Sequence, residues 1–161
     1  MMSGFGCTAV SNHLWAGQGA PKFSGPKDIG AHVKTSVNGK VGPFARATGF
    51  FTTPLKHLGI AGWRDLGYDG EVTGVVQQTA ISTDQFYTVD MRVETLQIGG
   101  QDVSPQDERY LRAEVCLRDV SLLEKDWPRG TRVWMRGRMM WDGDGFIEIH
   151  PRNGGEVHKI N

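Results

Sequence analysis

Cysteine is scarce in this chain, since its 161 residues include only Cys7 and Cys116. Two cysteines exclude a four-cysteine zinc site, and their spacing gives no reason to expect a disulfide. Long apolar runs are missing too, because no segment approaches the ~20 residues that span a membrane. The start, MMSGFGCTAV, has no basic segment before an apolar one, so we expect no secretory signal. We therefore expect a reducing, cytoplasmic setting without membrane association.

An excess of one charge is also missing, because 18 Lys and Arg face 18 Asp and Glu. This balance excludes the basic footprint over the whole chain that is typical of avid nucleic-acid binding. The balance hides an asymmetry, because residues 1–70 hold seven basic and three acidic residues, whereas residues 71–161 hold eleven and fifteen. We expect the two parts to attract each other or to have separate partners.

Motifs for catalysis and metal binding are absent from the sequence. There is no Gly-x-Ser-x-Gly and no His-Glu-x-x-His, and the five histidines are scattered without ligand spacing. The AGQGAPK segment at 16–22 lacks the Gly-Lys-Ser/Thr ending of a phosphate-binding loop. The DGDG segment at 142–145 has too few oxygen ligands for calcium and is typical of a hairpin turn. We expect no enzyme activity, no metal and no cofactor.

Glycine, with 22 residues, is the abundant residue type, and it indicates many turns and little helix. The Gly-, Pro- and Ser-rich first thirty residues predict an extended arm or loop. Asn38-Gly39, between short β-forming runs at 33–41, predicts a hairpin. Residues 55–67 have room for one helical turn at most. We therefore expect a Gly-rich extension with a hairpin over 1–70, docked on the rest of the chain or on a partner.

Residues 71–161 show the period of two that is typical of strands, and we expect strands over 71–82, 85–98 and 109–120. The TRVWMRGRMMWDGDGFIEIHP segment, 131–151, predicts two more strands joined at 142–145. Within it, one row comprises Val133, Met135, Gly137, Met139 and Trp141, and the opposite row comprises Arg132, Trp134, Arg136, Arg138 and Met140. The first row is apolar and predicts the core. The mid-strand glycines Gly74 and Gly137 are positions where a barrel can bend or bulge.

Five antiparallel strands with apolar inner faces bury those faces best by closing into a small barrel. The glycine-bearing GEVTGVV, the segment PRGTRVWMRGRM and the short GFIEIHP carry a resemblance of residues 71–160 to the OB-fold family. The resemblance implies an all-β, five-stranded OB-like barrel. Many members bind single-stranded DNA, RNA or oligosaccharide across the second and third strands, and others only hold assemblies together.

Aromatic and basic residues share the predicted outward face. A single strand of nucleic acid uses such residues, because rings stack on bases at ~1–3 kcal/mol each and charges contact phosphates. The candidate binding residues are Phe86, Arg92, Tyr110, Arg112, Trp134, Arg136, Arg138 and Phe146. The run from Trp134 to Arg138 is the strongest local candidate, because no acid interrupts it.

Two alternatives stay open for this face. Asp90, Glu94, Glu114 and Glu148 lie on it, so the arginines could pair with carboxylates across strands. The basic arm could also cover the aromatic residues. The sequence thus predicts a non-catalytic protein that binds single-stranded DNA or RNA, or alternatively an assembly module, oligomeric, whose residues 1–70 dock on neighbouring subunits.

Overall fold

Strands make up most of the computed structural model, which describes residues 21–33, 63–81, 86–116, 127–142, 146–152 and 154–160. The strands are β1 (Trp63–Ile81), β2 (Phe86–Ile98), β3 (Gln101–Asp102), β4 (Tyr110–Cys116), β5 (Arg132–Asp142), β6 (Phe146–His150) and β7 (Val157–Lys159). One short helix, α2 (Pro26–Ala31), and a 3-10 turn at Gly154–Glu156 complete the described elements. The all-β prediction is confirmed. No helix in the described part of the chain is long and apolar enough to cross a membrane.

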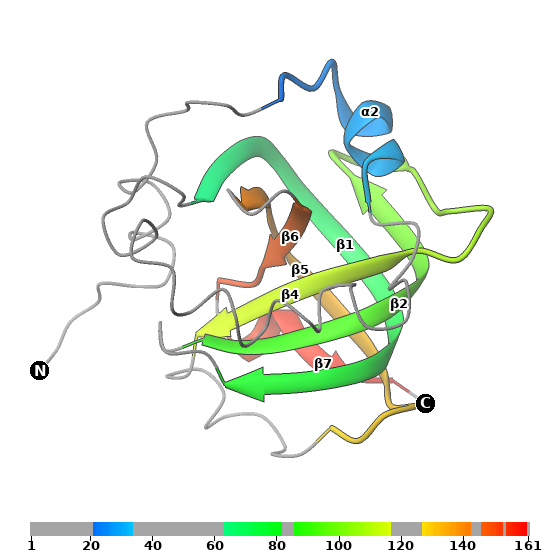
Figure 1. The fold of residues 1–161 in the computed structure, drawn as a ribbon, viewed down its shortest axis with the longest axis vertical. Coiled ribbons are helices and arrows are strands. Elements are labelled where there is room, and N and C mark those ends of the chain that lie inside the picture. The colour runs from blue at the N-terminus through cyan, green and yellow to red at the C-terminus, as the bar shows by residue number, and fades with distance from the viewer. Residues whose placement is uncertain are drawn as a thin grey trace, which may run out of the picture.

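Five of the strands close into a ring, in which β1 pairs with β2, β2 with β4, β4 with β6, β6 with β5, and β5 again with β1 (Figure 1). Four of these pairings are antiparallel, and the β4–β6 pairing is parallel. The parallel pair joins Arg112 to Glu148 and Ala113 to Ile149. The sequence pattern did not predict a parallel pair, because alternation along a strand carries no information about the direction of its neighbour.

The interior of the ring is apolar, as the alternation predicts. Val133, Met135 and Met139 are each fully buried in the core cluster. The other strands contribute Val72, Val76, Val89, Met91, Leu111, Ala113 and Ile149 to the same cluster. Burying this surface is the main stabilising term of the fold. Met140, predicted on the outward row, is buried as well, and its neighbours in register are Asp65 and Glu148.

Two glycines let the backbones of neighbouring strands approach closely. The register between β1 and β2 shifts between Thr73 and Gly74, and a Cβ at Gly74 would lie 2.7 Å from the carbonyl oxygen of Arg92. A Cβ at Gly137 would overlap the backbone of His150 and Pro151. The expected irregularity at Gly74 is confirmed, and Figure 1 shows β1 curving strongly.

The N-terminal part differs from the extended arm that its composition predicts. Residues 26–31 form α2, which starts at Pro26, and Ile29 and Val33 join the core cluster of the barrel. Ile29 lies in α2 and Val33 follows its C-terminal end, and the burial of both apolar side chains outweighs the loop-forming flanks. The Arg109 guanidinium fixes the end of this segment by donating to the carbonyl oxygen of Val33 at 2.8 Å.

The boundaries before β1 also differ from the prediction. Trp63 to Gly67, expected within a possible helical turn, form the start of β1 and pair in part with the end of β5. The hairpin predicted at 33–41 lies, apart from Val33, outside the described residues.

Candidate nucleic-acid interface

Trp134 lies on the outer face of β5 and is held by two neighbouring strands. Its indole Nε1 donates to Glu71 Oε1 of β1 at 2.8 Å. Its ring stacks on the His158 imidazole of β7, with a centroid separation of 4.6 Å and an interplanar angle of 25°. Trp134 is half-buried and His158 is exposed. The sequence gave no role to His158, because β7 lies beyond the strands that the OB-like pattern predicts.

The arginines around Trp134 are paired with carboxylates. Arg138 contacts Asp65 and Asp69 of β1 at 2.9 and 3.1 Å. Arg136 Nε donates to Glu156 at 3.3 Å. The run from Trp134 to Arg138 is free of acids along the sequence, but β1 and the C-terminal segment bring acids to it in space. Cross-strand pairing, the first of the two alternatives, therefore describes these arginines.

This pairing shifts the ionisation of the groups involved. The hydrogen bond from Arg138 to Asp65, followed by that to Asp69, raises the pKa of Arg138 against the effect of burial. For Asp69, burial alone would raise the pKa, but the hydrogen bonds from Arg138 and Arg152 bring it below its ordinary value. Both shifts favour the charged pair, so these arginines have anionic partners without a ligand.

Arg112, predicted to contact phosphates, is buried and bound to Asp90. Its Nε and Nη2 donate to the two oxygens of that carboxylate at 2.7 and 2.9 Å. Arg112 lies on the sheet face opposite Leu111 and Ala113, as expected, yet only 1% of its surface is exposed. The prediction that it faces solvent is therefore wrong. Burial would lower the pKa of Arg112, but the hydrogen bond and charge of Asp90 raise it, so the guanidinium stays ionised.

Beside this pair, Glu114, Glu148 and His150 come together from β4 and β6. Their ligand atoms lie within 4.8 Å of one another, and all three residues are buried. His150 Nε2 lies 2.9 Å from Glu148 Oε2. These atom types could coordinate a metal. However, both carboxylates also lie close enough to Arg112 to raise its pKa, and that fixed positive charge disfavours a cation beside them. The arrangement is therefore that of a buried ionic group.

Sequence reasoning placed Glu114, Glu148 and His150 on the outward face and missed their convergence. The available signal was the repeated spacing, a charged or titratable residue at every second position in both strands. Which of these residues meet depends on the parallel β4–β6 register, and the sequence pattern does not contain that register.

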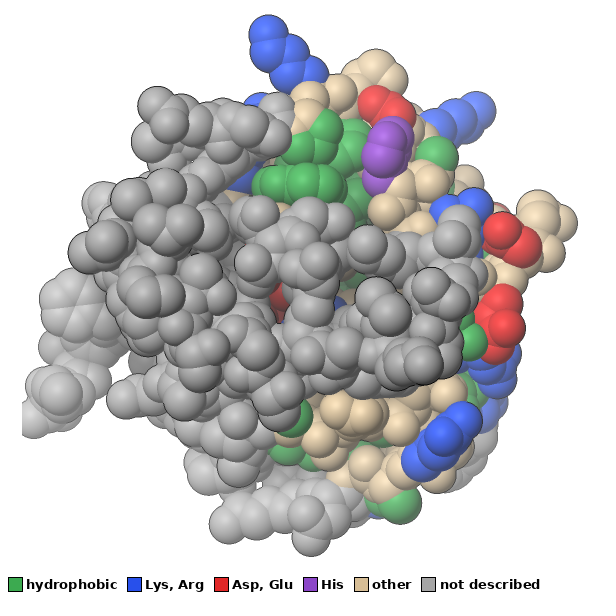
Figure 2. All heavy atoms as spheres, viewed as in Figure 1, with side chains coloured by type: hydrophobic (Ala, Val, Ile, Leu, Met, Phe, Trp, Pro, Cys, Tyr) green, Lys and Arg blue, Asp and Glu red, His purple; other side chains and the backbone are tan. Residues whose placement is uncertain are grey.

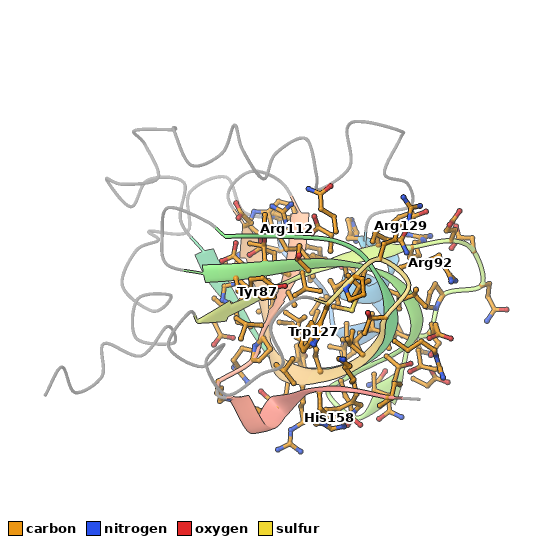
Figure 3. The ribbon with its side chains drawn as sticks, turned by 90° about the horizontal axis from the view of Figure 1, so that it is seen from below. Tyr87, Arg92, Arg112, Trp127, Arg129 and His158 are labelled. Carbon is orange, nitrogen blue, oxygen red and sulfur yellow. The ribbon has the colours of Figure 1, made fainter. Side chains whose placement is uncertain are left out.

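A second group of basic side chains surrounds Tyr110, at the start of β4. Arg92 of β2 lies opposite Tyr110 in register. A hydrogen bond to Glu108 and burial raise the pKa of Tyr110, whereas the charges of Arg92 and Arg129 act to lower it, which places both guanidinium groups near the phenol. Figure 3 shows Arg92 and Arg129 at the same edge of the ring. Tyr110 was predicted on the outward face, either exposed or covered, and the structure shows it covered, with 8% of its surface accessible.

Arg92 and Arg129, here called the arginine pair, differ from the arginines of β5. Arg92 is half-buried, Arg129 is exposed, and within the described ranges neither has a carboxylate partner. Arg129 was not among the predicted binding residues, because it lies in the connector before β5. A basic residue between Pro128 and Gly130 at a strand end was the available signal.

The turn that carries Arg129 is fixed at both sides. Trp127 is buried and packs edge-on against Tyr87, with ring centroids 6.3 Å apart. The Gly130 amide donates to the carbonyl oxygen of Val76 at 2.8 Å, and Gly130 has a φ of 96°, which favours glycine. The turn thus holds the backbone of Arg129 against β1, and among the residues that the structure describes its side chain has no ion-pair partner.

The remaining predicted residues are Phe86 and Phe146. Each is the first residue of its strand, Phe86 opposite Cys116 and Phe146 opposite Asp142. Their side chains lie outside what the structure describes, so their role stays a prediction. On the face seen in Figure 2, basic side chains of the described residues stand apart with acidic ones among them, and no single basic patch gathers there.

The closed order β1-β2-β4-β6-β5, with its long, bent first strand, is the arrangement of an OB-fold barrel. No family model matches the sequence, and no curated protein is similar to it in sequence.

Among solved structures, the chain is similar to the dimeric N-terminal domain of PriB protein from Thermoanaerobacter tencongensis, with 13% identity and a TM-score of 0.37, covering 58% of this chain and 96% of that one. It is similar to Rim1, a mitochondrial single-stranded DNA binding protein from S. cerevisiae, with 7% identity and a TM-score of 0.36, covering 58% and 93%. It is also similar to a deletion mutant of the single-stranded DNA binding protein from Thermus aquaticus, with 12% identity and a TM-score of 0.37. That match covers 58% of this chain and 50% of the other. At these values, the fold assignment rests on the strand pairing described above.

Proposed function

We propose that this protein binds single-stranded nucleic acid without catalysing a reaction, and that the arginine pair holds the phosphates. The observation that carries the proposal is the contrast among the arginines. Arg112, Arg132, Arg136 and Arg138 form ion pairs with carboxylates. Arg92 and Arg129 both lie near the Tyr110 phenol, beside Glu108, and form no ion pair within the described part of the chain. Two guanidinium groups near one phenol attract an anionic ligand.

The chemistry of the pair suits a phosphate. A guanidinium presents parallel N–H donors that match two phosphate oxygens, and it keeps its charge at any physiological pH. Arg92 comes from a strand and Arg129 from a turn with fixed hydrogen bonds, so little order has to be gained on binding.

The surroundings favour a nucleic acid strand over a lone anion. In the β-sheet register, Arg92 lies opposite Val75 of β1, and Val75 lies opposite Arg132 of β5. Trp134 follows Arg132 on the same outer face. Arg132 is itself paired with Glu94 at 2.9 Å, so the aromatic ring of Trp134 is the next group along this face that suits a base of the bound strand.

The paired arginines have a smaller part in this proposal. A phosphate at Arg136 or Arg138 would have to replace Glu156, Asp65 or Asp69 and would meet their negative charge. Arg112 would in addition have to leave a buried carboxylate. We therefore place the phosphate contacts at Arg92 and Arg129.

The test is a binding titration of a labelled thymidine oligonucleotide at low salt, followed by fluorescence anisotropy. Arg92→Ala and Arg129→Ala should each weaken binding about ten-fold or more, because a hydrogen bond to a charged group is worth ~1.5–3 kcal/mol. The matched control is Lys27→Ala, which removes the same charge from an exposed position on α2. Absence of binding at low salt, or an equal loss in the control, contradicts the proposal.

Light scattering on the same samples separates this proposal from the assembly role predicted from the sequence. A nucleic-acid binder gains mass with the oligonucleotide. An assembly module instead self-associates without one, and its self-association is indifferent to Arg92→Ala.

A further inference from the structure

We propose that Trp134 and His158 form a stacking platform for a base of the same bound strand. The platform lies on β5 and on β7, a strand outside the five-strand ring. The proposal rests on the proposed function and adds a second contact to it, of a different chemical kind from the arginine pair.

The two rings are already stacked in the protein alone. Their centroids are 4.6 Å apart and their planes differ by 25°. The hydrogen bond from the indole to Glu71 at 2.8 Å fixes the rotation of Trp134. A platform that is ordered before binding loses little side-chain entropy when a base arrives.

The backbone holds His158 over Trp134. The two residues face each other in the antiparallel β5–β7 register, and the Ile160 amide donates to the carbonyl oxygen of Arg132 at 2.9 Å. Before β7, Glu156 accepts from the Arg152 amide at 2.9 Å and from Arg136. The last strand is thus attached to β5 on both sides of His158.

We infer that a base stacks on the second face of the His158 ring. Trp134 covers one face of the imidazole, and His158 is nevertheless exposed. A nucleobase on the free face would extend the stack from two rings to three. Stacking of this kind tolerates any base, because each base has a π-face.

Charge distinguishes the platform from the arginine pair. Glu71 bonds the indole, and Arg136, opposite Glu71 in register, is paired with Glu156. Positive and negative side chains therefore balance around the rings. A neutral base suits this position better than a phosphate does.

The platform lies within reach of a strand held by the arginine pair. Arg92 and Trp134 lie on either side of β1. Arg92 is opposite Val75 of β1, and Trp134 is opposite Thr73 of the same strand. Two strand spacings of ~4.8 Å and a step of two residues along a strand give a separation of ~12 Å. A single phosphate cannot touch both, whereas an oligonucleotide can.

The experiment compares two ligands of equal length, a thymidine oligonucleotide and an abasic one with the same phosphates, both of ~12 nucleotides, within the range that one OB-fold binds. His158→Ala should weaken binding of the thymidine ligand about ten-fold and leave the abasic ligand unchanged. Arg92→Ala should weaken both. His158→Phe, which keeps an aromatic ring, should restore thymidine binding.

The matched control is His32→Ala. His32 is also an exposed histidine, and its imidazole contacts the ring of Phe23 near α2. Circular dichroism confirms that each variant keeps its strands. If His158→Ala changes the affinity for neither ligand, or for both equally, the proposed platform is contradicted while the proposed phosphate contacts of the arginine pair are not. If neither ligand binds the unaltered protein, the platform and the proposed function both fail.

Discussion

Arginines at equivalent outward positions have different surroundings in this protein, as Arg112 and Arg92 show. Arg112 lies opposite Asp90, so it forms a bidentate ion pair. Arg92 lies opposite Val75 and Tyr110, neither of which can neutralise it. Alternation along the sequence predicted the outward direction of both side chains correctly. It could not predict their partners, because those belong to other strands.

At this scale we predict that Arg112→Met lowers the free energy of unfolding by ~3–5 kcal/mol. Removing one partner of a buried ion pair leaves the other charge buried and uncompensated. Urea denaturation at neutral pH measures the change. Arg92→Met is the matched control and should stay within ~0.5 kcal/mol of the unaltered protein. Equal effects of the two substitutions would contradict the buried pairing of Arg112 with Asp90.

Elements far apart in the sequence are joined by a network of ion pairs around Asp69 of β1. Its carboxylate accepts from Arg138 of β5 and from Arg152, which follows β6. Arg152 in turn contacts Glu156, just before β7. The network attaches the first and last described strands to β5. The sequence suggested cross-strand pairs in general, but the acids that it named are Asp90, Glu94, Glu114 and Glu148, none of which belongs to this network.

The stability contributed by Asp69 should depend on pH. Because the pKa of Asp69 in the folded chain is below the ordinary value of 3.8, its ionised form stabilises the fold above that value. The contribution is lost as the pH falls below 3.8 through the folded pKa. Urea denaturation should show Asp69→Asn to be less stable than the unaltered protein at neutral pH, with a gap that closes in strong acid. Asp69 is about half exposed, so added salt should also reduce the gap, and a gap independent of pH would exclude this role.

Across the whole molecule, the outer surface offers a route from the arginine pair on β2, over β1, to Trp134 and His158. Arg92 and Arg129 lie near Tyr110 at the first end of this route, and stacked rings lie at the other. Closure of β5 onto β1 brings the two ends within reach of one strand of nucleic acid, since the middle of β1 pairs with β2 on one side and with β5 on the other. Binding should therefore have separable electrostatic and stacking contributions.

The salt dependence of oligonucleotide affinity tests this separation. Each phosphate neutralised on a single strand contributes about −0.7 to the slope of log affinity against log salt concentration, so two contacts predict about −1.4. Arg92→Ala should reduce the slope by about 0.7, whereas His158→Ala should lower affinity with the slope unchanged. Anisotropy titrations at several salt concentrations measure both. A slope near zero would exclude phosphate contacts at the arginine pair.

The sequence by itself determined the class of fold, the inner row of Val133, Met135 and Met139, and the irregularity at Gly74. These features depend on the alternation of neighbouring residues and on the freedom of one glycine, which are local properties. The tertiary structure alone decided that Arg112 is buried with Asp90, that Arg129 and Arg92 both lie near Tyr110, and that His158 stacks on Trp134. Each of these contacts joins segments distant in the chain, and the register and closure of the barrel fix them through the packing of all strands together.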